Sequence, residues 1–175
     1  MSRIYFTIGV NGVGKTSIIP YLKIMLGEGF AIHDFDERGV PNNAGSEWRR
    51  SETKHWIETG KRALDEGIST IISGFSKPEE IRTAADELGV PVSIILLDAD
   101  AQAITSRILG RYPSEESLAE LERTTGKTPE KFAADNVWVS SKFREAAIEH
   151  DFLIIDTSLL TPEEVAQQVV QAITA

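Results

Sequence analysis

The chain has 175 residues, of which 41% are hydrophobic and 26% are charged, a size and composition typical of one globular domain with its own core. Its net charge of −9 argues against binding of a nucleic acid polymer, and the lack of cysteine excludes disulfides and thiolate metal sites. Because no stretch is apolar over the roughly 20 residues that cross a membrane, we expect a cytoplasmic protein, as a monomer or homodimer.

The N-terminal segment RIYFTIGVNGVGKTS, residues 3–17, contains every fixed position of the phosphate-binding pattern G-x-x-x-x-G-K-[ST]. Residues 4–8 form a buried-strand pattern and residues 15–27 a helical one, so the loop lies where the motif requires it. Its glycines turn backbone N–H groups toward an anion, and the helix adds its positive end. We predict that ATP phosphates bind Gly9, Asn11, Gly12, Val13, Gly14, Lys15, Thr16 and Ser17.

Two side chains of this loop have chemical roles in the pattern. Lys15 is expected to reach the β- and γ-phosphates and to act in catalysis. The hydroxyl of Thr16 is expected to bind Mg²⁺, which prefers hard oxygen ligands. The sequence therefore predicts both ATP and Mg²⁺ as cofactors.

Short apolar runs then alternate with helical patterns along the rest of the chain. Further strands are predicted at residues 30–35, 68–73, 92–97 and 152–155. Further helices are predicted at residues 46–66, 78–88, 100–110, 129–150 and 162–173, and Gly60 leaves open whether the first of these is continuous. Residues 114–128 are highly charged, and we expect them to be mobile.

Five strands that alternate with helices predict a parallel sheet with right-handed crossovers, and thus a three-layer α/β fold over residues 1–175. In such sheets ligands bind beyond the carboxyl ends of the strands. Asp34 and Asp36 follow the second strand, where a carboxylate can hold a metal-bound water or accept a proton from a hydroxyl. Both are catalytic candidates, with Asp34 as the candidate metal ligand and Asp36 as the candidate substrate ligand, and either of them could accept the proton of a hydroxyl acceptor. Alternatively, they solvate the strand end and cap a turn.

Arginines are the third group of candidates. Arg107 and Arg111 lie four residues apart after the fourth strand, where guanidinium groups can stabilise a phosphoryl group in transfer and, for Arg107, bind the nucleotide. They flank residues 111–128, which we interpret as a lid. Arg49 belongs to residues 38–66, the predicted acceptor-binding region, and can hold an anionic substrate. Trp48 and Trp56 in the same region are interpreted as packing residues.

With these residues in place, the chain resembles the small P-loop kinases, the group that contains nucleoside monophosphate kinases and shikimate kinase. The resemblance covers nearly the whole chain in element order and is strongest in GVNGVGKT. Residues 73–77 are similar to the D-G-F-P-R of adenylate kinases, residues 107–111 to the R-I-x-G-R that opens their lid, and residues 34–36 to the D-x-D of shikimate kinase.

The resemblance implies the strand order 2-3-1-4-5, a closing lid and a γ-phosphoryl transfer from Mg·ATP to a small acceptor. It implies adenine near residues 156–158, and acceptor contacts from Gly74, Phe75 and Lys77. Two positions depart from the pattern. Ser73 replaces an aspartate, which points to Asp34 as the metal-binding carboxylate, and Lys77 lacks the fork of an arginine.

The residues are compatible with two classes of acceptor and with one alternative class of protein. The acceptor is a nucleoside monophosphate, which residues 74–75 and 107–111 favour slightly, or a hydroxyl compound as in shikimate or gluconate kinases, which Asp34 and Asp36 favour. Asp98 ends a strand that resembles the second motif of mechanical ATPases, but Ala99 replaces their glutamate. A switch protein, or a protein that binds nucleotide without turnover, is therefore the alternative class.

Overall fold

The computed structural model describes residues 3–42 and 44–175, so that residue 43 of the predicted acceptor-binding region lies outside it. Five parallel strands form one sheet in the order β2-β3-β1-β4-β5, which confirms the predicted order. The strands are β1 (Ile4–Ile8), β2 (Phe30–Asp34), β3 (Ser69–Gly74), β4 (Val92–Asp98) and β5 (Leu153–Asp156).

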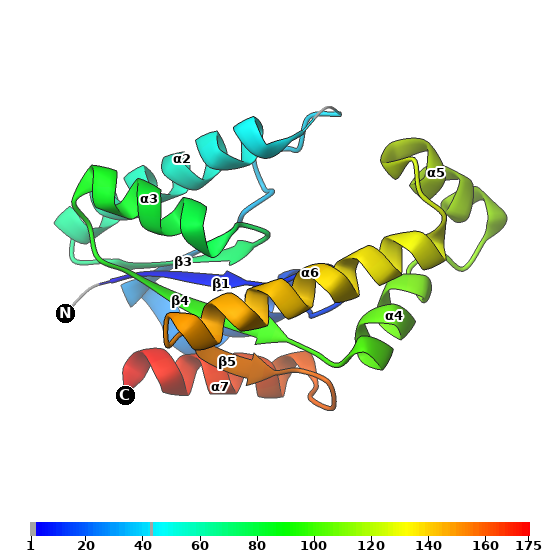
Figure 1. The fold of residues 1–175 in the computed structure, drawn as a ribbon. Coiled ribbons are helices and arrows are strands. Elements are labelled where there is room, and N and C mark those ends of the chain that lie inside the picture. The colour runs from blue at the N-terminus through cyan, green and yellow to red at the C-terminus, as the bar shows by residue number, and fades with distance from the viewer. Residues whose placement is uncertain (1–2, 43) are drawn as a thin grey trace.

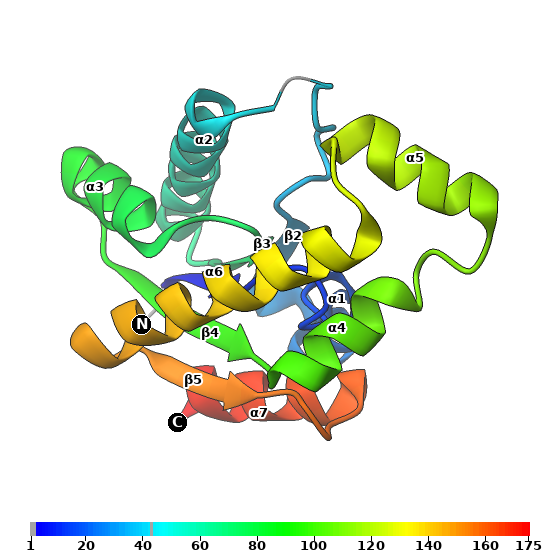
Figure 2. The same ribbon diagram turned by 45° about the vertical axis from the view of Figure 1, so that its right-hand side comes forward.

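Helices cover both faces of the sheet (Figures 1 and 2). On one face lie α1 (Ile19–Leu26) and α7 (Pro162–Thr174). On the other lie α2 (Ser46–Asp65), α3 (Pro78–Leu88) and α6 (Pro129–Glu149). The shorter α4 (Ala101–Leu109) and α5 (Glu115–Thr125) follow β4 at the carboxyl end of the sheet.

The central strand β1 explains why two hydrophobic cores form. Ile4, Phe6 and Ile8 pack in the core beneath α2, α3 and α6, whereas Tyr5 packs in the core on the α1 side. All five residues of β1 are buried, as expected for a strand that is covered on both faces. Helices α4 and α5 lie at the carboxyl end of the sheet, away from the C-terminus of α7 (Figure 1).

The segment after the phosphate loop differs from the predicted continuous helix over residues 15–27. Residues Thr16–Ile18 form a short 3₁₀ helix, and α1 begins only at Ile19. Pro20 in the first turn of α1 has no backbone N–H to donate to the carbonyl of Thr16, so a regular α-helix cannot include both residues.

The structure also shows whether α2 is continuous at Gly60 and which secondary structure residues 115–125 adopt. Helix α2 runs unbroken past Gly60, because that glycine packs against Ile4 of β1, where an added Cβ would lie 2.9 Å from the isoleucine side chain. Residues 115–125, expected to be mobile, form the regular helix α5. A capping box between Ser114 and Ser117 starts this helix, and Gly126 ends it in a left-handed conformation.

Among the described residues, no helix combines the length and apolar character of a membrane span.

Candidate active site

The phosphate loop connects β1 to the 3₁₀ helix and is held by contacts from both sides. The ammonium of Lys15 donates a hydrogen bond of 2.7 Å to the carbonyl of Val10, across the loop. Ser73 of β3 donates to the carbonyl of Lys15 at 2.9 Å. Gly14 has a φ of +95°, a conformation that favours glycine, so the loop depends on this residue to turn its N–H groups inward.

Asp34 and Asp36 lie at the end of β2, two strands away from the loop. Asp34 is the register partner of Ser73, whose position holds the aspartate in the kinases that the sequence resembles. The backbone turns after Asp34, because its Oδ1 accepts a hydrogen bond of 2.9 Å from the N–H of Asp36. Both carboxylates act electrostatically on Lys15, as does Arg111. Four of the five predicted catalytic residues therefore share one charged cluster.

Burial and the neighbouring charges shift the pKa values of Lys15 and Asp36 in this cluster. Desolvation, and then the positive charge of Arg111, lower the pKa of Lys15 to about 8. Partial desolvation and then the neighbouring Asp34 raise the pKa of Asp36, against the opposing effect of Lys15. A carboxylate with a raised pKa is a better proton acceptor, and a lysine with a lowered pKa still carries its charge at neutral pH.

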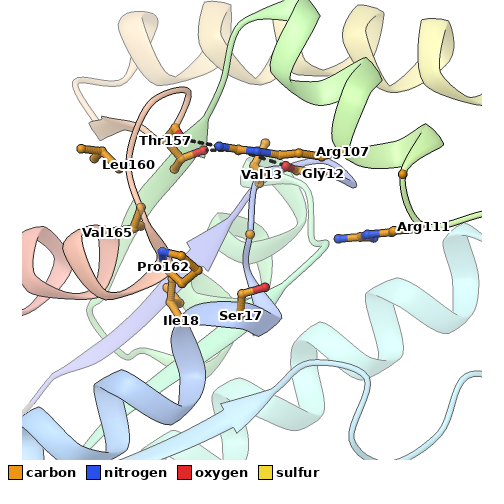
Figure 3. A pocket seen from close by; sticks show the side chains of 12 residues that line it. Gly12, Val13, Ser17, Ile18, Arg107, Arg111, Thr157, Leu160, Pro162 and Val165 are labelled. Carbon is orange, nitrogen blue, oxygen red and sulfur yellow. Dashed lines mark hydrogen bonds between the residues drawn. The ribbon is translucent and has the colours of Figure 1, made fainter.

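A cavity of about 460 Å³ lies beside the loop (Figure 3). Gly12, Val13 and Ser17 of the loop region form one side of it, and Leu160, Pro162 and Val165 near the start of α7 form an apolar side. Thr157 and Arg107 complete the lining, while Arg111 extends toward the phosphate loop. The cavity thus joins an apolar surface to the phosphate loop.

Arg107 lines this cavity, and both of its terminal nitrogens donate hydrogen bonds to the protein. Its Nη1 donates to the carbonyl of Gly12 at 3.2 Å and to Oγ1 of Thr157 at 3.1 Å. Its Nη2 donates to the carbonyls of Thr157 and Ser158 at 2.6 and 3.2 Å. The guanidinium therefore ties the phosphate loop to the segment after β5, which is the segment that the resemblance assigned to adenine. Arg111, by contrast, is exposed.

The predicted acceptor contacts divide between two places. Gly74 packs against Phe35 at the strand ends, and Phe75 stacks on Phe143 of α6. Arg49 and Lys77 instead line a separate cavity of about 560 Å³ between α2 and α3. Arg49 lies over the ring of Phe75, but its Nε and Nη2 donate to both carboxylate oxygens of Glu80 at 2.7 and 2.8 Å. Lys77 lies 3.8 Å from Glu79. As substrate ligands, both residues remain predictions.

The tryptophans of α2 are packing residues, as interpreted from the sequence. Trp56 is buried, and its indole N–H donates to the carbonyl of Phe35 at 3.0 Å. Trp48 packs edge-on against the ring of Phe35. Together they hold the peptide that connects Asp34 to Asp36, and so fix the position of the carboxylate pair.

Helix α6 supplies two contacts that the sequence patterns did not indicate. Oδ1 of Asn136 accepts hydrogen bonds from the backbone and side-chain nitrogens of Asn11 at 3.0 and 3.2 Å. Ser140 and Arg144 donate to the buried Asp98 at 2.6 and 2.5 Å. Neither contact belongs to a short motif, because 125 residues separate Asn11 from Asn136. Asp98 is thus bound to α6, and Asp100 caps α4 by accepting from the N–H of Ala103.

The residues at the loop fit a magnesium ion of the kind that a bound nucleotide brings. Among the described residues, no group of three or more metal-binding side chains forms a cage of its own. Mg²⁺ commonly binds one or two protein ligands together with phosphates and waters, so a cage is not required. Thr16 offers an exposed hydroxyl next to Lys15, and Asp34 offers a carboxylate in the same cluster.

Comparisons with known proteins establish the fold. No protein-family model and no curated protein sequence matches the chain. A sugar kinase from Janibacter sp. HTCC2649 matches 99% of this chain and 95% of its own, at 20% identity and a TM-score of 0.65. Shikimate kinase from Acinetobacter baumannii matches 99% and 94%, at 16% identity and a TM-score of 0.63.

A third solved structure, the APS kinase of Mycobacterium tuberculosis, matches 99% of this chain and 98% of its own, at 16% identity and a TM-score of 0.56. The chain therefore has the fold of the small P-loop kinases over almost its whole length, as the sequence resemblance implied. At these identities the likeness establishes the fold, and the activity has to be argued from the site itself.

Proposed function

We propose that this protein is an ATP-dependent kinase that transfers the γ-phosphoryl group of Mg·ATP to a hydroxyl group of a small molecule. The observation that carries the proposal is the single cluster of Lys15, Arg111, Asp34 and Asp36 at the carboxyl edge of the sheet. Phosphoryl transfer requires positive groups for the phosphates and a carboxylate for the acceptor, and this cluster contains both. The solved kinases that share the fold support the same reaction class.

The residues have separate roles in the proposed reaction. Lys15 and Arg111 bind the β- and γ-phosphates, and the cavity lined by Arg107 and Thr157 holds the nucleoside. The acceptor oxygen forms a bond to the γ-phosphorus while the bond from that phosphorus to the β–γ bridging oxygen breaks. The hydroxyl proton passes to the carboxylate of Asp36, and ADP and a phosphate ester are the products.

Thr16 and Asp34 are the residues that would hold Mg²⁺. When bound, this ion neutralises negative charge on the β- and γ-phosphates. The strand register supports the role of Asp34, since it lies beside Ser73, the position of the missing aspartate. Asp36 is then left for the acceptor.

A hydroxyl acceptor agrees with the site better than the nucleoside monophosphate that the sequence slightly favoured. A nucleoside monophosphate brings two negative charges, for which the sequence offered Arg49 and Lys77. Both cations are next to glutamates of α3, and Arg49 is bound to Glu80 through two hydrogen bonds. The solved structures that share the fold include a shikimate kinase, an APS kinase and a gluconokinase, and shikimate is a hydroxyl compound.

The alternative of a mechanical ATPase or switch has less support. Such proteins need an acidic residue free to act at the end of a strand next to the loop. Asp98 holds that position, but its two carboxylate oxygens accept from Ser140 and Arg144.

The test is ADP formation from Mg·ATP with a panel of sugars, polyols, hydroxy acids and nucleoside monophosphates. We expect ADP formation to require a hydroxyl compound and to be lost in Lys15→Ala. ADP formation that is independent of any added compound would favour the ATPase alternative. Turnover restricted to nucleoside monophosphates would restore the acceptor class that the sequence favoured.

A further inference from the structure

We propose that Arg38 and Glu52 are positioning residues, which hold the carboxylate of Asp36 in place for the acceptor through the backbone turn that contains Arg38. The inference rests on the proposed kinase function, in which Asp36 accepts the proton of the acceptor. It follows from how one face of α2 contacts this turn.

The position of the Asp36 carboxylate depends on its backbone. Among the described residues, no hydrogen bond or ion pair engages its two carboxylate oxygens. The N–H of Asp36 donates to Oδ1 of Asp34 at 2.9 Å, and its carbonyl accepts from the N–H of Gly39 at 2.9 Å. Residues 36–39 therefore form a tight turn, with Arg38 as its third residue, and this turn sets the direction of the carboxylate.

Three side chains of α2, spaced four residues apart, contact the chain at this turn. Trp48 packs edge-on against the ring of Phe35, and Trp56 donates to the carbonyl of Phe35 at 3.0 Å. Between these tryptophans, Glu52 accepts from Nη1 of Arg38 at 3.1 and 3.3 Å. Residues four apart lie on one face of a helix. The tryptophans thus hold the chain where it enters the turn, and Glu52 holds it within the turn.

Burial of the carboxylate makes the pairing of Glu52 with Arg38 a firm one. The side chain of Glu52 is only 9% exposed, and among the described residues Arg38 alone forms an ion pair with it. A buried charge that lacks its partner is costly, so Glu52 keeps Arg38 at this place on α2. The turn that presents Asp36 is therefore anchored to a helix of the core.

A structural role and a positioning role of this pair predict different results. If the pair only stabilises the fold, its loss lowers the free energy of unfolding, and activity returns when stability returns. If the pair positions Asp36, its loss lowers kcat at unchanged affinity for ATP, whether or not the fold is destabilised.

The test uses four variants of the full chain. Arg38→Met removes the anchor and leaves the buried Glu52 without a partner. Combining Arg38→Met with Glu52→Gln removes the anchor and the buried charge together, which is expected to restore stability towards urea. Arg38→Lys keeps a cation for Glu52. Glu87→Gln breaks a different ion pair of α2, that of Lys54 with Glu87 at 3.0 Å, and is the control.

We expect kcat to fall by about ten- to a hundredfold in Arg38→Met and in the double variant, because a misplacement of roughly 1 Å can cost a hundredfold. The Kd for ATP, measured by calorimetry, should stay the same, since the phosphate loop keeps its bonds to Ser73 and Asn136. Arg38→Lys should retain most of kcat, and Glu87→Gln all of it. A kcat that is unchanged in Arg38→Met, or that recovers in the double variant, overturns the inference.

NMR relaxation of the backbone amides of Asp36 and Gly39 tests the turn without any turnover. We expect their order parameters to fall from about 0.85 to below about 0.6 in Arg38→Met and in the double variant. Unchanged order parameters overturn the inference. If the unmodified protein forms no acceptor-dependent ADP, the kinase proposal fails, and a fall in the order parameters would still show that the pair holds the turn.

Discussion

The side-chain oxygen of Asn136 accepts two hydrogen bonds from Asn11, one from its backbone nitrogen at 3.0 Å and one from its side chain at 3.2 Å. Asn136 is itself held by a bond from its Nδ2 to the carbonyl of Phe132. Helix α6 begins directly after the lid helix α5, so this contact connects the lid region to the phosphate loop.

Asn136→Ala should therefore weaken ATP binding. The substitution removes the partner of the N–H of Asn11, which is partly buried, and a hydrogen bond of this kind contributes about 0.5–1.5 kcal/mol. We expect the Kd for ATP to rise by roughly tenfold, as measured by calorimetry. Asn136→Asp keeps an accepting oxygen for Asn11, but it loses the donor to Phe132 and adds a negative charge beside the phosphate loop, so we expect it to weaken ATP binding at least as much. Equal ATP affinity in Asn136→Ala and the unmodified protein would show that the contact does not position the loop.

The pKa of Lys15 predicts a pH dependence of ATP binding. Because this pKa is lowered to about 8, the ammonium loses its proton above that pH in the free protein. Binding of polyphosphate favours the charged form, so we expect the affinity for ATP to fall as pH rises through about 8, by up to tenfold per unit. Lys15→Arg, whose side chain stays charged, should show little change over the same range. A flat profile in the unmodified protein would contradict the lowered pKa.

The two arginines of the cavity should separate in steady-state kinetics. Arg107 binds the backbone of Gly12 and Thr157, so Arg107→Lys should mainly raise the KM for ATP. Arg111 is exposed and acts electrostatically on Lys15, so Arg111→Lys should mainly lower kcat. The comparison of kcat and KM in the two variants checks these roles. A reversal of the two effects would assign the phosphates to Arg107 instead.

Gly74 tests whether the strand ends are as tightly packed as the structure indicates. An added Cβ at this position would lie 2.1 Å from Cβ of Phe35, so Gly74→Ala must displace the residue between Asp34 and Asp36. We expect a loss of roughly 1–3 kcal/mol in the free energy of unfolding, measured by urea denaturation. Gly29→Ala, where no atom lies within 4 Å of the added Cβ, is the control. Equal stability of the two variants would contradict the close packing.

The strands and the phosphate loop were predictable from local patterns and a strong motif, whereas the sheet order came from the resemblance to the small P-loop kinases. The continuous helix predicted over residues 15–27 was wrong because Pro20 has no N–H to donate to the carbonyl of Thr16, so α1 begins only at Ile19. Helix α5 was missed because its surface is highly charged, although Ser114 and Gly126 mark its two ends.

The side-chain partners of the site were less predictable than its backbone. The sequence correctly placed Lys15, Asp34 and Asp36 at one edge of the sheet, since the strand ends determine their positions. It did not indicate that Glu80 binds Arg49, or that Asn136 binds Asn11, because these pairs join residues 31 and 125 positions apart. Such contacts follow from how helices pack on the sheet, which no short motif encodes.

In the proposed reaction, Asp36 accepts the proton of a hydroxyl acceptor while Lys15 binds the phosphates of ATP. The most direct measurement follows a radiolabelled γ-phosphate of ATP in the presence of the hydroxyl compound that supports turnover, in the unmodified protein and in Asp36→Asn. We expect the label in a phosphate ester with the unmodified protein. In Asp36→Asn we expect transfer to fall at least about a hundredfold while ATP still binds. Label that appears only as inorganic phosphate, at equal rates in both proteins, would contradict the account.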